Sequence, residues 1–212
     1  MQEENIRSVH LTFVISLQAC GILANGSEKD SKNGQIAMEI GQGLHIDAHR
    51  KGYTSLTRVG NTLVSMYGKT GAIDKAEDVF RGLTKHNEVS CNALLSVYVE
   101  NGQGEKALRL YRQMQDERVC CNELTFAVTS QACLILAEKE ESLQCPKTMA
   151  LEIARALYYD AQRRGFGSDA FLCNMLISLF GMHGSLAEAE LTFSNLFCQD
   201  IKSWTVIFSA YV

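Results

Sequence analysis

The sequence predicts an all-α fold, a solenoid of stacked helix-turn-helix repeats. The main observation is that the stretch Asn61–Leu83 comes back as Asn92–Met114 and as Asn174–Leu196, with a Gly ten residues after each opening Asn. A second observation is that the 212 residues include one proline, Pro146, which suits a run of helices. With 46% hydrophobic and 21% charged residues, the chain can bury a sizeable core.

Each copy of this stretch is predicted to form two helices. In the first copy Leu63 and Tyr67 fall on one helical face, and Ala76 and Phe80 have the same spacing in the second half. Gly71 lies between them, where the end of a helix needs a residue that tolerates positive φ. The small Ala lets the two backbones approach, and the aromatic residue fills the space beyond it. Because such a hairpin cannot bury its apolar face alone, the hairpins must stack.

A longer period of 113 residues relates the two halves of the chain. Residues 1–99 align without a gap to residues 114–212, and 35 of the 99 pairs are identical. LTFVISLQAC at Leu11–Cys20 matches LTFAVTSQAC at Leu124–Cys133. The alignment begins and ends inside a repeat, so we expect the chain to be a window from a longer array.

The two periods together divide the chain into units of three lengths. We predict one solenoid over residues 1–212, built of a partial repeat 1–9, a long unit 10–56, a short unit 57–87, a standard unit 88–122, a long unit 123–169, a short unit 170–200 and a partial repeat 201–212. The polar stretches Asn25–Gln35 and Glu138–Thr148 are expected to be loops between the two helices of the long units.

Composition and motifs limit the possible functions. No apolar stretch approaches the 18 residues or more of a membrane span. The eight cysteines lack C-x-x-C spacing and mostly lie in apolar runs, so we expect small, reduced core residues rather than disulfides or metal ligands. No phosphate-binding loop and no convincing nucleophile and base are visible. We therefore expect no catalytic residues, no metal and no cofactor.

The repeated residues resemble the pentatricopeptide repeat family. The resemblance rests on VGNTLVSMYGKTGAIDKAEDVF at Val59–Phe80, VSCNALLSVYVENGQGEKALRLYRQM at Val89–Met114, the segment Asn122–Cys133 and SWTVIFSAYV at Ser203–Val212. It covers nearly the whole chain, and the alternation of unit lengths resembles the plant-type long/short/standard subclass. Two departures are long units of 47 residues and Cys91 and Cys173 at a place where the family often has Trp. The resemblance implies a right-handed α-α superhelix.

The resemblance also implies sequence-specific binding of single-stranded RNA, with about one base read per repeat. Members of the family mostly act in mitochondria or chloroplasts, in RNA processing or in selecting targets for C-to-U editing. Editing or processing proteins are then possible partners, and neither DNA nor a membrane is expected. The deaminase domain of some plant members needs H-x-E followed by C-x-x-C. His86-Asn87-Glu88 spells H-x-E, but no C-x-x-C follows, so we predict a binder and not an enzyme. The start, MQEENIRSVHLTF, does not resemble a transit peptide.

In the family, the fifth and the last residue of a repeat choose the base. Carried over here, the reading pairs are Asn61 with Asn87, Asn92 with Asn122, and Asn174 with Asp200, while Thr205 opens a further unit, and the long units offer Val14 with Leu56 and Ala127 with Asp169. Asn with Asn or Asp resembles a pyrimidine reader, Thr favours a purine, and the long-unit pairs match no firm code. The residue three before each reader is expected to contact the base: Val89 and Phe171 by stacking, Arg58 and Lys202 through bases or phosphates.

Two alternatives stay open. An Asn at the start of a helix commonly caps free backbone N–H groups, although recurrence in register favours reading. A net charge of −4 lacks the basic footprint of a nucleic-acid binder. A tetratricopeptide-like scaffold for protein partners would suit that charge, but its constant period does not fit the cycle of unit lengths.

Overall fold

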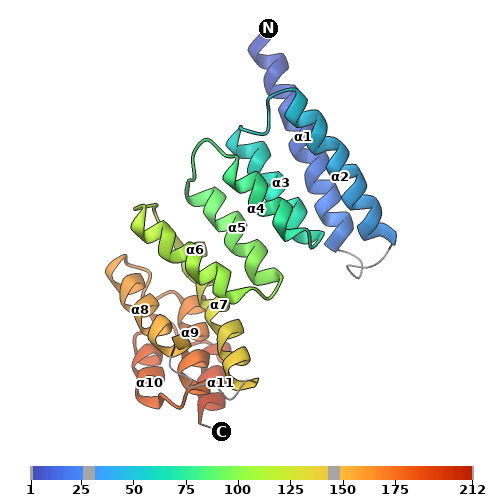
Figure 1. The fold of residues 1–212 in the computed structure, drawn as a ribbon. Coiled ribbons are helices and arrows are strands. Elements are labelled where there is room, and N and C mark those ends of the chain that lie inside the picture. The colour runs from blue at the N-terminus through green and yellow to red at the C-terminus, as the bar shows by residue number, and fades with distance from the viewer. Residues whose placement is uncertain (1, 26–31, 143–148, 212) are drawn as a thin grey trace. The chain divides into compact units, whose positions relative to one another are not determined.

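A computed structural model describes residues 2–25, 32–142 and 149–211. All of the regular structure in these residues is helical, which confirms the predicted all-α class (Figure 1). The helices are α1 (Gln2–Asn25), α2 (Lys32–Arg50), α3 (Thr57–Lys69), α4 (Ile73–Arg81), α5 (Glu88–Glu100), α6 (Gly104–Asp116), α7 (Glu123–Ser142), α8 (Met149–Arg163), α9 (Ala170–Met182), α10 (Leu186–Ser194) and α11 (Ile201–Ala210).

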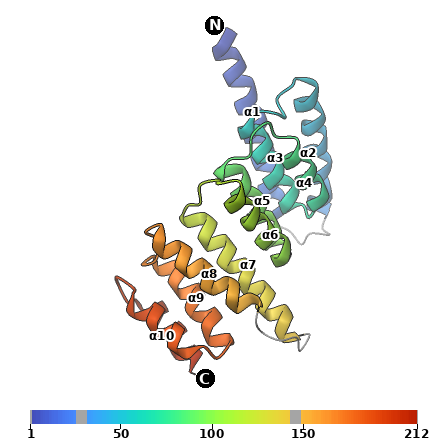
Figure 2. The same ribbon diagram turned by 60° about the vertical axis from the view of Figure 1, so that its left-hand side comes forward.

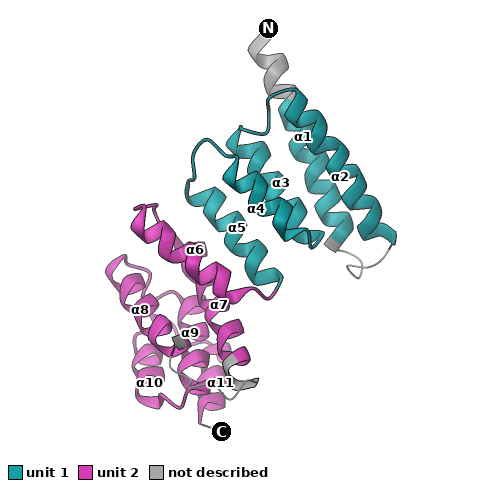
Figure 3. Cartoon of the chain, in the orientation of Figure 1, with its two compact units in different colours: residues 1–101 teal, residues 102–212 magenta. Residues whose placement is uncertain are grey.

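The chain divides into two compact units, residues 1–101 and residues 102–212 (Figure 3). The division falls between α5 and α6. In unit 1, the residues up to 101, α1, α3 and α5 pack side by side as one layer, and α2 and α4 pack against them as a second layer (Figures 1 and 2). In unit 2, α7, α9 and α11 form the corresponding layer, and α8 packs on α7 and α9 while α10 packs on α9 and α11. Each unit is therefore a stack of helical hairpins.

The glycines that end the first helices have the predicted conformation. Gly71, Gly102 and Gly184 have φ values of 76°, 68° and 69°. After α3 the chain closes with a hydrogen bond from the amide of Ala72 to the carbonyl of Tyr67, which satisfies a carbonyl at the helix end. The tight turn sends the second helix back along the first.

The core of each unit lies between its two layers. The alanines at the start of the second helices, Ala76 and Ala189, are completely buried, as predicted. Tyr67 in unit 1 and Phe180 in unit 2 are among the largest buried side chains, and they occupy equivalent places in the 113-residue period. Among the described cysteines five are buried, but Cys120 and Cys198 are exposed, so the prediction of core cysteines is wrong for these two.

The predicted loops of the long units are shorter than expected. Helix α1 continues to Asn25, α2 begins at Lys32 and α7 continues to Ser142, so residues 32–35 and 138–142 are helical. Lys32, Glu138 and Lys139 are exposed in these helix ends, and Lys and Glu are residues that favour the helical state. The rest of the two predicted loops, residues 26–31 and 143–148, lies outside the described residues.

The first helix also runs through the predicted boundary between residues 9 and 10. At the equivalent place in the second half, Asn122 precedes α7 and its side-chain oxygen accepts a hydrogen bond from the amide of Thr125. The residue that matches Asn122 is Val9, whose side chain cannot accept such a bond. Among the described residues, none of the helices has the length and apolar character needed to cross a lipid bilayer.

Candidate nucleic-acid interface

The five predicted closing residues all lie immediately before a first helix, and all except Leu56 accept a hydrogen bond from its third residue. In each pair the side-chain oxygen of the closing residue accepts from a backbone amide: Asn87 from Ser90 at 2.9 Å, Asn122 from Thr125 at 3.0 Å, Asp169 from Leu172 at 2.8 Å, and Asp200 from Ser203 at 2.7 Å. These bonds satisfy backbone N–H groups that have no partner within the helix. The capping role considered from the sequence therefore belongs to the closing residues.

The predicted fifth residues lie one turn inside the first helices. Asn61 and Asn174 are partly exposed, and each has a buried side-chain oxygen without a hydrogen-bond partner among the described residues. An unpaired buried acceptor is costly, so each of these oxygens gains free energy when it meets a donor. The two residues are 113 apart, and the shared environment follows from the shared register.

The other fifth residues differ from this pair. Asn92 is buried, with 4% of its surface exposed, so its amide is less accessible than its place in the repeat suggests. Thr205 is exposed, and its hydroxyl donates to the carbonyl of Ile201 at 2.7 Å. Ala127 is half-buried and has no side-chain polar atom. The structure thus separates the partly exposed asparagines of the short units from the buried asparagine of the standard unit.

The predicted stacking residues form an exposed series. Val89 and Phe171 are 60% and 59% exposed, and Arg58 and Lys202 are also exposed. Sequence reasoning missed the equivalent residues of the long units, which are Leu11 and Leu124. Both are exposed leucines, and their position three residues before Val14 and Ala127 was the signal that could have found them. Large exposed apolar side chains at one register position are typical of a binding surface.

A cavity of about 560 Å³ opens between the middle of α1 and the start of α3. It contains Leu11 and Val14 from α1, Leu56 from the turn, and Arg58 from α3; the remaining lining residues are His10, Thr57 and Val59. The cavity therefore brings together the fifth and last residues of the long unit, Val14 and Leu56, with two contact positions. These positions are Leu11, the second residue of the long unit, and Arg58, the second residue of the short unit. Its size falls within the range of small-molecule sites.

Two polar groups act at or near this cavity. One ring nitrogen of His10, Nδ1, is buried and has no hydrogen-bond partner among the described residues, while the ring lies edge-on against Tyr53 at 5.7 Å. Arg58 supplies a permanent positive charge at the rim. Val14 is buried and apolar, so it offers no hydrogen bond to the cavity.

The electrostatics of the closing residues oppose phosphate binding. Hydrogen bonds from the amide and hydroxyl of Ser203 lower the pKa of Asp200, so its carboxylate is ionised at neutral pH. The negative charge lies at the start of α11, two residues from Lys202. A ligand at this end must therefore gain more from base contacts than from its phosphates.

The H-x-E triplet has a structural role at His86. Its Nε2 lies 2.9 Å from the carbonyl oxygen of Phe80, and the two rings stack with centroids 4.3 Å apart. This arrangement joins the end of α4 to the turn before α5. In the described part of the chain, no three His, Cys, Asp or Glu side chains come together in a group that could hold a metal ion.

Comparisons with known proteins agree with the hairpin architecture. A model of the PPR repeat matches residues 61–87, and a model of the PPR repeat family matches residues 86–134. The chain is 31% identical over 173 residues to the chloroplastic pentatricopeptide repeat-containing protein CRR2 of Arabidopsis thaliana, covering 81% of this chain and 24% of that protein. It is 25% identical over 212 residues to a mitochondrial pentatricopeptide repeat-containing protein of the same plant, covering 100% of this chain and 18% of that protein.

Among solved structures, the chain is similar to the pentatricopeptide repeat protein PPR10, crystallised in complex with an 18-nt psaJ RNA element. The TM-score is 0.40 and the sequence identity 17%, over 82% of this chain and 30% of that one. The chain spans about a quarter of the length of CRR2. From the two matching repeat models and these relatives, we conclude that the chain belongs to the pentatricopeptide repeat family.

Proposed function

We propose that this chain binds single-stranded RNA in a sequence-specific way, through the N-terminal ends of its first helices. The observation that carries the proposal is the cavity of about 560 Å³, which joins Val14 and Leu56 with the exposed side chains of Leu11 and Arg58. Val14 and Leu56 are the predicted reading positions of the long unit, and Arg58 is the predicted contact residue of the short unit that follows. Leu11 holds the equivalent contact position of the long unit, which the sequence reasoning missed. A nucleobase in this cavity lies between an aliphatic side chain and a guanidinium plane, both of which pack on base faces.

The short units supply the hydrogen bonds that distinguish bases. In each, the amide of Asn61 or Asn174 lies one turn into the helix with an unpaired oxygen, which can accept from a base edge. The predicted tract is pyrimidine, pyrimidine, any base, uracil and purine, with the N-terminal end of the chain toward the 5′ end of the RNA. Asn92 contributes to this tract once its buried side chain becomes accessible, so the proposed hydrogen bonds to bases come first from the short units.

The biological setting is proposed from the relatives. CRR2 is chloroplastic and another relative is mitochondrial by name, so we propose that this chain acts in one of these organelles. Its role there is to direct RNA processing or C-to-U editing to a target, with the chemistry performed by protein partners or by another part of a longer protein. We also propose that the whole chain forms one right-handed solenoid of the long/short/standard subclass.

The test is a binding titration with labelled RNA of the predicted tract. The comparison ligands are the same RNA with purines at the sites of Asn61 and Asn174, and single-stranded DNA of the tract sequence. We expect the first RNA to bind at least about tenfold more tightly than either, and the variants Asn61→Thr and Asn174→Thr to shift the preference toward a purine at one site each. Gln113→Thr, at an exposed position on α6, serves as the matched control and should change nothing.

Equal binding of the three ligands would contradict base reading by these residues. Failure of all three to bind would favour the alternative function, a helical scaffold for a protein partner. A shift caused by Gln113→Thr would show that the preference does not depend on the first helices.

A further inference from the structure

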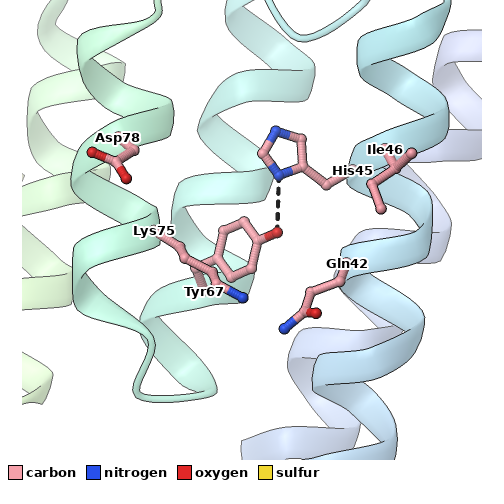
Figure 4. Close-up of a pocket in the computed structure, with 6 residues that line it drawn as sticks. All are labelled: Gln42, His45, Ile46, Tyr67, Lys75 and Asp78. Carbon is pink, nitrogen blue, oxygen red and sulfur yellow. Dashed lines mark hydrogen bonds between the residues drawn. The ribbon is translucent and has the colours of Figure 1, made fainter.

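A second cavity, of about 290 Å³, lies in unit 1 between the C-terminal half of α2, the end of α3 and the start of α4 (Figure 4). It is built mainly on the layer of second helices and shares no lining residue with the cavity between α1 and the start of α3. Its lining residues are Gln42, His45, Ile46, Tyr67, Lys75 and Asp78.

A histidine and a tyrosine form the fixed wall of this cavity. His45 Nδ1 and the hydroxyl oxygen of Tyr67 are 2.9 Å apart. Burial, and then the charges of His49 and Lys75, lower the pKa of His45, so its ring is neutral at neutral pH. Burial raises the pKa of Tyr67, which keeps the hydroxyl protonated and able to donate to Nδ1. The proton of the neutral imidazole is then on Nε2.

The two side chains opposite this wall are both hydrogen-bond donors. Figure 4 shows the amide of Gln42 and the ammonium of Lys75 on the same side of the Tyr67 ring, and the ammonium is 5.8 Å from the ring centroid. Among the described residues, neither Gln42 nor Lys75 has a hydrogen-bond or ion-pair partner. Asp78 also lines the cavity, and its carboxylate accepts at 3.0 Å from Arg81, whose guanidinium also pairs with Glu77 at 2.9 Å.

The equivalent place in unit 2 is closed by an ion pair. The residues 113 positions after Gln42 and Lys75 are Arg155 on α8 and Glu188 on α10. Nη2 of Arg155 donates to Oε2 of Glu188 at 3.0 Å, and Nε donates to the other carboxylate oxygen. In unit 2 the chain therefore supplies its own carboxylate between the second helices. In unit 1 the same two positions hold an ammonium and an amide, and no carboxylate.

We propose that the cavity of unit 1 binds the carboxylate of an acidic side chain, glutamate or aspartate, from a partner polypeptide. One carboxylate oxygen accepts from the ammonium of Lys75 and the other from the amide of Gln42, while the stem of the guest packs on Ile46. The guest replaces the carboxylate that Glu188 provides in unit 2. A volume of about 290 Å³ suits one side chain. The site is independent of the proposed RNA interface.

The test is an NMR titration of the full chain with a blocked peptide that contains one glutamate. We expect saturable shifts in the side-chain signals of Gln42 and His45, and binding about tenfold weaker for the matching glutamine peptide. Acetate is added as a third ligand, to distinguish a peptide side chain from any small carboxylate. The RNA titration described above should be unchanged by the peptide.

Two double variants exchange the residue pair at positions 42 and 75 of unit 1 with the pair at positions 155 and 188 of unit 2. Gln42→Arg with Lys75→Glu builds the ion pair of unit 2 in unit 1 and should abolish peptide binding while RNA binding persists. Arg155→Gln with Glu188→Lys should create a second peptide site of similar affinity. Lys75→Met, which keeps the stem but removes the charge, should weaken binding in the same assay if the double variant does not fold.

Equal affinity for the glutamate and glutamine peptides would overturn the proposal, as would undiminished peptide binding by Lys75→Met. Tighter binding of acetate than of the peptide would also overturn it, because the partner would then be a small acid. If the chain binds the glutamate peptide but does not bind the RNA, the proposed function is contradicted and the carboxylate site is still supported.

Discussion

Asn87 shows at the scale of one residue how capping and base reading overlap. Its side-chain oxygen accepts from the amide of Ser90, and the hydroxyl of Ser90 accepts from the amide of Asn87 in return. This reciprocal pair satisfies two backbone donors at the start of α5. A change at Asn87 therefore alters the stability of the fold as well as the edge offered to a base.

We expect Asn87→Ala to lower the free energy of unfolding by about 1 kcal/mol, because the amide of Ser90 loses its side-chain acceptor. Urea unfolding followed by far-UV circular dichroism measures this change. Asn87→Ser is the matched control, since serine also caps and should cost only a few tenths of a kcal/mol. If the two variants are equally stable, the side chain of Asn87 does not stabilise α5.

Between elements, tyrosine hydroxyls connect successive helices at repeated places. Tyr98 on α5 donates to Glu77 on α4 at 3.1 Å, and 113 residues later Tyr211 donates to Glu190. In unit 2, Tyr111 on α6 donates to Asp160 on α8 at 2.9 Å. These hydrogen bonds join different hairpins, so they contribute to stacking and not only to the stability of one helix.

The hydrogen bonds of Asp160 predict that the stability of the fold falls at acidic pH. Burial raises the pKa of Asp160, but hydrogen bonds from Arg164, Tyr111 and Gln115 outweigh it and lower the pKa below its usual value of 3.8. A carboxyl with a lowered folded-state pKa stabilises the fold above 3.8, and this contribution is lost as the pH falls further. We expect Asp160→Asn to be about 1 kcal/mol less stable than wild type at pH 7, with a smaller difference near pH 3.

Urea unfolding at the two pH values measures the difference. If Asp160→Asn lowers the free energy of unfolding by the same amount at pH 7 and at pH 3, the charge of the Asp160 carboxylate does not stabilise the fold.

Gly52, in the turn after α2, allows a test of whether a positive φ is what requires glycine there. Gly52 has a φ of 70°, Gly43 is a helical residue of α2, and an added Cβ would meet no atom within 4 Å at either place. Because space is available at both, backbone conformation alone should decide the effect. We expect Gly52→Ala to destabilise unit 1 by about 1 kcal/mol and Gly43→Ala to stabilise it by a similar amount.

Thermal unfolding of the two variants gives the comparison. The same sign for both changes would show that the positive φ at Gly52 is not what selects glycine there.

Across the whole chain, the hairpins were predictable because their determinants are local. Gly71 and Ala76 are separated by a fixed spacing that repeats, and each acts on its immediate neighbours. The extent of α1 and α7 was not predictable from polarity, since exposed helix ends and loops have the same composition. The burial of Asn92 and the cavity around His10 depend on packing between residues far apart in sequence, which a position in a repeat does not specify.

The net charge of the chain predicts how salt affects RNA binding. The contact positions include two cations, Arg58 and Lys202, and the chain carries a charge of −4. With about two phosphates neutralised, the logarithm of the binding constant should fall with the logarithm of the salt concentration with a slope near −1.4. Fluorescence anisotropy between low and moderate salt measures the slope. A slope steeper than about −4 would place the affinity in phosphate contacts away from the predicted positions.

The closing residues belong to one unit by sequence and to the next unit by hydrogen bonding. Asp169 closes the second long unit, yet its side chain secures the first helix of the unit that follows. Recombination that cuts immediately after residue 169 would leave the transplanted α9 without its cap, whereas a cut one residue earlier would keep cap and helix together. The modules that can be exchanged between such proteins are therefore offset by one residue from the repeats seen in an alignment.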